Sequence, residues 1–210
     1  MTQQQKRIGM SLAGVLITGF CVGTFQKAAL GTDPFTCFVT GIANLFHSTY
    51  STFYLILTGA LLAVVFLVDR HYIGLATIFN LLGTGFAADL MRGFLDGWFP
   101  NPSLWTRGIM MAVGLLGACC SASLYFTADL GVSAYDAQSL IAAQKLKRVP
   151  FKLCRIATDC LCVLVGLLFH ANVGIGTVIT ALCMGPMVQW FHTHLSEPLL
   201  YGAPLPPESR

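Results

Sequence analysis

The sequence predicts an all-helical transmembrane bundle made of two tandem repeats, each with four helices in the order long, short, long, long. Hydrophobic residues make up 55% of the 210 residues and charged residues only 10%, whereas soluble domains carry about 25% charged residues. The two halves also resemble each other at an offset of 100 residues. Because a soluble chain of this length needs a polar surface, we expect a lipid bilayer to cover this one.

Six apolar stretches are long enough to cross a membrane, which takes about 20 residues. They cover approximately residues 8–28, 50–68, 72–95, 107–127, 152–170 and 173–193. The first stretch is too long for a cleavable signal peptide, so we expect it to remain as a membrane anchor. Two shorter apolar segments, 34–46 and 133–145, each follow a break in the apolar pattern that contains glycine: residues 30–34 form the first break and residues 130–133 the second.

The internal repeat is clearest at its glycines. At the offset of 100, the following pairs align: Leu30 with Leu130, Gly31 with Gly131, Gly74 with Gly174, Thr77 with Thr177, and Gly85 with Gly185. We therefore predict a first membrane repeat at 1–97, a linker at 98–106, a second repeat at 107–195, and a disordered cytoplasmic tail at 196–210.

The relative direction of the repeats depends on the short helices. If these helices cross the membrane, eight segments span it and the repeats are parallel; if they are re-entrant, six segments span it and the repeats are inverted. The crossing arrangement leaves only Lys27 and Arg70 outside the cytoplasm, as the positive-inside rule requires. The link from Phe46 to Tyr50 is too short for the return leg of a re-entrant loop. We therefore favour eight segments, parallel repeats and two cytoplasmic termini.

The two breaks form the candidate binding site. Interrupted helices at matching positions of two repeats mark the binding sites of transporters. The candidate substrate-binding residues are Gly31, Asp33, Asp129, Gly131, Ser133 and Asp136. The alternative is that Asp33 before Pro34, and Ser133 with Asp136, only cap the short helices. Asp129 would then be an exposed loop charge.

Asp159 lies one helical turn after Arg155, so the two can form an intramembrane charge pair. A charged residue at membrane depth is by default a functional hypothesis. Alternatively, Arg155 reaches the cytoplasmic edge and Asp159 only neutralises it. A further set is predicted to serve helix packing or gating: Gly74, Thr77, Gly174, Thr177, Gly185 and Pro186.

Several kinds of function find no support in the sequence. The eight cysteines lie almost entirely in apolar runs and form no CxxC motif, which is typical of reduced, buried thiols. No catalytic triad, HExxH motif or phosphate-binding loop occurs. The charge of +3 is too scattered for nucleic acid. We therefore expect no metal, no cofactor, no nucleic-acid partner and no enzymatic activity.

A family resemblance adds to these observations. Residues 128–136 (ADLGVSAYD), Arg155, Asp159, the segment Gly174-Ile175-Gly176-Thr177 and the pair Gly185-Pro186 resemble bacterial membrane proteins of the YczE type, which are related to the YitT group. The resemblance covers residues 7–195 and is more specific in the second half. It implies a multi-pass protein of the bacterial cytoplasmic (inner) membrane, in a group mostly described as uncharacterised or as permeases. It implies no substrate.

The function that fits best is a small secondary transporter, or permease, with a polar or charged solute bound between the repeats. The alternative is a non-catalytic membrane scaffold or accessory subunit, which would act with a partner membrane protein such as an exporter or a biosynthetic enzyme. A homodimer is compatible with both. A membrane-embedded enzyme is a third hypothesis, but no catalytic constellation supports it.

Overall fold

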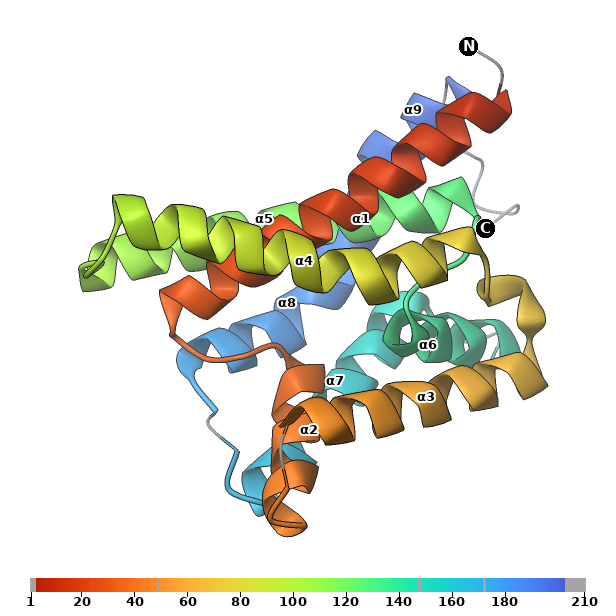
Figure 1. The fold of residues 1–210 in the computed structure, drawn as a ribbon. Coiled ribbons are helices and arrows are strands. Elements are labelled where there is room, and N and C mark those ends of the chain that lie inside the picture. The colour runs from red at the N-terminus through yellow and green to blue at the C-terminus, as the bar shows by residue number, and fades with distance from the viewer. Residues whose placement is uncertain (1–2, 49, 147–148, 172, 203–210) are drawn as a thin grey trace.

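The computed structural model describes residues 3–48, 50–146, 149–171 and 173–202, which are helical with short connections and contain no strand (Figure 1). The helices are α1 Gln3–Ala28, α2 Pro34–Leu45, α3 Tyr50–Val68, α4 Leu75–Trp98, α5 Leu104–Ala128, α6 Ala134–Lys145, α7 Phe151–Leu168, α8 Ile175–Phe191 and α9 Glu197–Tyr201. Two short turns, η1 Arg70–Tyr72 and the π-helical η2 His192–Ser196, precede α4 and α9. The six long and two short helices predicted from the sequence are therefore all present.

The surface of this bundle is rich in large apolar side chains. Leu67 is 82% exposed, Phe86 73% and Trp105 86%. Among the described helices, α1 and α5 are long and apolar enough to cross a membrane. An apolar surface of this extent is unusual for a soluble monomer, and it agrees with a membrane protein.

The helices α1 and α5, which correspond in the two halves, pack against each other in opposite directions. Gly14 on α1 lies against Ser121 on α5, and Gly114 on α5 lies against Phe25 on α1. Between these two contacts, Thr18 Oγ1 is 2.9 Å from Ser121 Oγ. Residue numbers rise along one helix as they fall along the other, and Figure 1 shows the two running antiparallel. The predicted parallel repeats were wrong, because corresponding helices of parallel repeats point the same way.

Several further contacts occur in both halves. Helix α4 lies on α1 through Gly19 and Gly23, where a Cβ would come within 2.4 Å of Ala87 and of Ala88 respectively. Helix α8 lies on α5 in the same way, and Gly176 packs against Met111. The short helices cross over: α2 packs on α7 of the second half and α6 on α3 of the first.

Both ends of the segment 30–44 contact the chain around the end of α7 and the start of α8. Asn44 Nδ2, near the end of α2, donates to Phe169 O at 3.3 Å and to His170 O at 3.2 Å, just after α7. Leu30, just before α2, accepts a hydrogen bond from Gly176 at the start of α8. Helix α2, whose 12 residues give it a length of about 18 Å, therefore lies beside the end of α7 and the start of α8. The structure does not show α2 crossing from one end of the bundle to the other.

The chain after α8 remains ordered. Ser196 Oγ is 2.7 Å from Ser123 Oγ on α5, and Leu200 is only 4% exposed. The prediction of disorder was therefore wrong for residues 196–201, because this turn is packed onto α5; residues 203–210 lie outside the described ranges. Arg7 Nη2 is 3.5 Å from the Tyr201 hydroxyl, so α1 starts and α9 ends at the same end of the bundle.

Candidate functional site

Each break is held by the opposite half of the chain. The carbonyl of Leu30 accepts a hydrogen bond from Gly176 N at 2.9 Å, at the start of α8. The carbonyl of Leu130 accepts one from Ala76 N at 3.1 Å, at the start of α4. These two bonds are related by the offset of 100 residues. The halves are thus interlocked through their breaks.

Glycine makes this interlock possible. Gly31 has φ +133° and Gly131 has φ +105°, a backbone region that strongly favours glycine. A Cβ on Gly74 would lie 2.1 Å from Leu130 O, and a Cβ on Gly174 would lie 2.0 Å from Leu30 O. The predicted packing role of Gly74 and Gly174 is therefore confirmed as a close approach to the opposite break.

Thr77 and Thr177 stabilise the starts of α4 and α8. Thr77 Oγ1 accepts a hydrogen bond from Gly74 N at 3.2 Å and donates to Val132 O at 2.8 Å. Thr177 Oγ1 accepts from Gly174 N at 3.4 Å. Both threonines are buried. Their contacts belong to packing at the interlock.

Gly185 and Pro186 lie where α8 crosses α7. A Cβ on Gly185 would come within 2.8 Å of Lys152 O, so this glycine also serves close packing. Pro186 sits inside α8, which nevertheless continues to Phe191. A hinge at this position stays a prediction.

The first residues of the short helices are capped, as predicted. Asp33 Oδ2 accepts a hydrogen bond from Thr36 N at 3.0 Å, and Pro34 follows at the first helical position. Ser133 Oγ accepts from Asp136 N at 3.1 Å. The carboxylate of Asp136 accepts from Ser133 Oγ at this helix end and, through its other oxygen, from Arg155 of α7.

Asp136 contributes to a buried charged cluster centred on Arg155, which is 5% exposed. The guanidinium donates to Asp136, and its Nε lies 3.3 Å from the carboxylate of Asp159. It also lies over the Tyr135 ring, 4.6 Å from the centroid. The structure brings the predicted pair of Arg155 and Asp159 together. The side chain of Arg155 is enclosed in the bundle instead of extending to its outside.

Uncharged hydroxyl groups donate further hydrogen bonds to both carboxylates. The Tyr125 hydroxyl donates to Asp136, as does Ser133 Oγ at 2.6 Å, and the Tyr135 hydroxyl donates to Asp159. Neither tyrosine was among the predicted site residues. A signal was present in the repeat, because Tyr125 and Tyr135 stand where the first half has Phe25 and Phe35.

The charged cluster has no counterpart in the first half. At the offset of 100, Asp136, Arg155 and Asp159 correspond to Thr36, Leu55 and Gly59 respectively. Two carboxylates face one guanidinium in the second half, so the cluster carries one net negative charge when all three groups are ionised. Uncompensated buried charge is costly. This asymmetry sets the second half apart chemically.

A cavity of about 570 Å³ lies between the two halves, next to this cluster. Gly31 and Asp33 of the first break line it, and so do Ser133, Asp136 and Arg155 of the second half. Further polar side chains add to the lining: Thr40 of the short helix α2, and Thr58, Asn80 and Thr84 of the long helices α3 and α4. Its volume is within the range typical of small-molecule sites.

Two predicted binding residues lie elsewhere. Asp129 is not among the described residues that line the cavity; it is half exposed and lies 2.8 Å from His71 Nε2. Gly131 packs against Gly74 in the interlock. Asp159 is not among the described lining residues either, but its partners Arg155 and Tyr135 are. Among the residues that the structure describes, no group of three or more His, Cys, Asp or Glu side chains could hold a metal ion.

These features define a helical protein with two interlocked, antiparallel halves around a polar cavity. The chain belongs to DUF6198, a family of unknown function that matches residues 5–193. An uncharacterized protein of Haemophilus influenzae is 27% identical over 192 residues, which cover 90% of this chain and 85% of that protein. The uncharacterized protein YyaS of Bacillus subtilis is 24% identical over 178 residues, which cover 83% of this chain and 86% of YyaS. No solved structure matches. These matches do not name the YczE or YitT groups, so that resemblance stays a prediction.

Proposed function

We propose that this protein is a small secondary transporter of the bacterial cytoplasmic membrane, with its solute bound in the cavity between the halves. The observation that carries the proposal is that both breaks and the buried charged cluster line one cavity. Two broken helices that meet at a polar cavity between repeats are the arrangement typical of secondary transporters.

In this proposal six helices span the membrane in inverted repeats: α1, α3, α4, α5, α7 and α8. The short helices are half-helices of 12 residues each, or about 18 Å, which is less than the hydrocarbon core of about 30 Å. The end of the bundle that holds both described chain ends faces the cytoplasm. That end carries Lys6, Arg7, Arg70 and Lys152, and the opposite end carries Lys27, Arg92 and Arg107. The difference follows the positive-inside rule.

The charges of the cavity favour a positively charged solute. Asp33 and Asp136 line it beside the single guanidinium of Arg155, and Asp159 lies directly behind Arg155. An ammonium group placed between Asp33 and Asp136 would neutralise one of the two excess negative charges of Asp33, Asp136, Asp159 and Arg155. In a site shielded from water, such a charge pair is stronger than at an exposed surface.

The first prediction tests this charge preference at Asp33. Asparagine caps helices as well as aspartate does, so Asp33→Asn keeps the bond to Thr36 N and removes only the charge. We expect purified wild-type protein to be thermally stabilised by ethylammonium. We expect Asp33→Asn to unfold at the same temperature without ligand and to bind ethylammonium about tenfold more weakly, as expected for a lost charged hydrogen bond.

A matched control is Asp129→Asn, which removes a carboxylate of the same kind outside the cavity and should bind normally. Uptake of labelled ethylammonium into proteoliposomes should likewise be reduced by Asp33→Asn and unchanged by Asp129→Asn. If ethylammonium neither stabilises the wild-type protein nor enters the vesicles, the proposal of a cationic solute is wrong. Stoichiometric co-purification of another membrane protein would then favour the scaffold function.

A further inference from the structure

The two halves differ in how their third and fourth helices pack. In the second half α7 packs on α8, where Gly185 meets Lys152 O and Met184 Sδ lies 3.8 Å from Arg155 Nη2. The equivalent helices of the first half, α3 and α4, hardly touch each other along their described residues. The bundle is therefore closed on one side of the cavity and open on the other.

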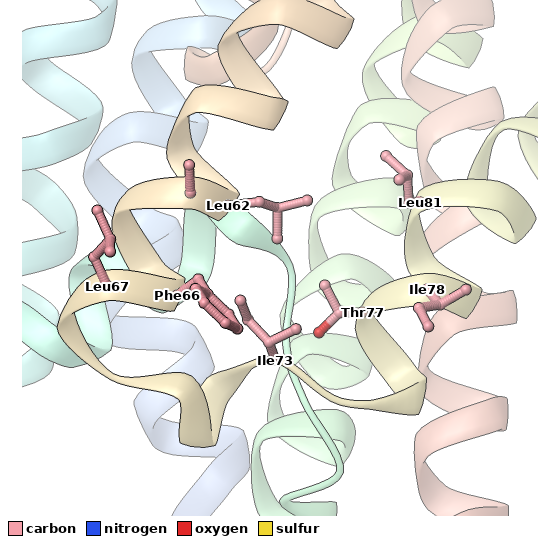
Figure 2. Close-up of a pocket in the computed structure, with 8 residues that line it drawn as sticks. Leu62, Phe66, Leu67, Ile73, Thr77, Ile78 and Leu81 are labelled. Carbon is pink, nitrogen blue, oxygen red and sulfur yellow. The ribbon is translucent and has the colours of Figure 1, made fainter.

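An apolar groove of about 470 Å³ occupies the space between α3 and α4. Figure 2 shows side chains of α3 on one side, such as Phe66, and side chains of α4 on the other, such as Ile78. Among the described residues that line it, Thr77 is the only polar one, and its hydroxyl is already bonded to Val132 O. The described side chains of the groove therefore offer a polar solute no free hydrogen-bonding group.

The groove and the polar cavity are neighbours, because Leu62, Thr77 and Leu81 line both of them. At the outer margin of the groove, Leu67 is 82% exposed and Ile78 56% exposed. In a membrane these side chains face the hydrocarbon. The negatively charged cavity thus lies next to an apolar groove that faces the bilayer.

We infer that the solute is an amphipathic amine, which enters from the bilayer between α3 and α4, places its ammonium group between Asp33 and Asp136, and leaves its alkyl chain in the groove. This inference rests on the proposed function and adds the substrate class and the route. The charge excess matches the head group, and the apolar lining matches the chain. A small hydrophilic cation would use only the cavity.

The test uses the full-length protein in lipid nanodiscs and measures binding of labelled ethylammonium. Octadecylammonium stays anchored in the bilayer, so it can compete only if the cavity opens sideways. We expect octadecylammonium to displace ethylammonium from the wild-type protein. Ile78→Trp fills the groove, and we expect this variant to bind ethylammonium normally. The concentration of octadecylammonium needed to displace ethylammonium should rise at least about tenfold, since an indole is large enough to block a groove of this size.

Ile109→Trp is the matched control, because Ile109 is 63% exposed on α5 and lies outside the groove. It should behave like the wild type. Non-specific repulsion by a positively charged bilayer would act equally on both variants, so only their difference is diagnostic. If Ile78→Trp fails to fold, Leu67→Trp provides the block at a more exposed position.

The outcomes separate the inference from the proposed function. If ethylammonium binds but octadecylammonium does not compete, or competes equally in Ile78→Trp, sideways entry of an amphipathic amine is overturned and the cationic transporter stands. If ethylammonium does not bind to the wild-type protein, both fail together. Competition that is lost only in the blocking variant supports the inference.

Discussion

At the scale of single residues, Arg155 is the side chain whose removal should cost most. Its guanidinium is enclosed beside Asp136 and Asp159, and breaking a buried ion pair from one side typically costs about 3–5 kcal/mol, because an uncompensated charge remains. We expect Arg155→Gln to lower the free energy of unfolding by this amount, as measured by denaturant unfolding in detergent micelles.

The repeat supplies a control for this prediction. Leu55 stands at the equivalent position of the first half and is 64% exposed, so Leu55→Ala should change stability by less than about 0.5 kcal/mol. Combining Arg155→Gln with Asp136→Asn and Asp159→Asn removes the stranded charges and should restore part of the loss. If Arg155→Gln alone is as stable as the wild type, the cluster is not held by charge pairing.

At the scale of secondary-structure elements, the interlock between the breaks and the starts of α4 and α8 depends on two glycines. A Cβ at Gly74 or Gly174 would lie about 2 Å from a carbonyl oxygen of the opposite break, and neither backbone can move without moving its helix. We expect Gly74→Ala and Gly174→Ala each to destabilise the protein by about 2 kcal/mol or more, as measured by thermal unfolding.

Gly93 lies in α4, the helix that Gly74 caps, and a Cβ at Gly93 would meet no atom within 4 Å. Gly93→Ala should therefore be neutral or stabilising by about 0.5–1 kcal/mol. If Gly74→Ala and Gly93→Ala have the same stability, the two halves are not interlocked as described. The contrast isolates the close approach from the general effect of replacing glycine in α4.

The elements themselves could be predicted because each depends on local sequence. Apolar length gave the long helices, and Asp33-Pro34 and Ser133 marked the starts of the short ones. The partners of these elements could not be predicted in this way. The bonds of Leu30 to Gly176 and of Leu130 to Ala76 join residues far apart in the chain, and a local pattern carries no information about such contacts.

The direction of the repeats was mispredicted for an identifiable reason. The prediction rested on the short link after α2, at Phe46–Tyr50, which leaves no room for the extended leg of a re-entrant loop. In the structure a further non-helical segment precedes α2, between Ala28 and Pro34. The charge count also discriminated poorly, because most basic residues stay on the cytoplasmic side in both arrangements.

At the scale of the whole molecule, a duplicated frame carries two features that are not duplicated. Among the described residues, the charged cluster of Asp136, Arg155 and Asp159 belongs to the second half, and the apolar groove lies between α3 and α4 of the first. The groove of one half and the charges of the other both border the cavity between the halves. Duplication thus explains the frame, and divergence between the halves explains the site.

The inverted arrangement makes a direct prediction about sidedness. Six spans place Arg70, between α3 and α4, in the cytoplasm and Trp98, at the end of α4, outside. In a background where the exposed Cys160 and Cys183 are alanine, an impermeant maleimide should label Trp98→Cys in intact cells and Arg70→Cys only after permeabilisation. The background protein, whose remaining cysteines are mostly buried, should stay unlabelled. The reverse pattern would contradict six spans with cytoplasmic termini, because it fits only the parallel, eight-segment topology or the same six-span bundle inserted in the opposite direction.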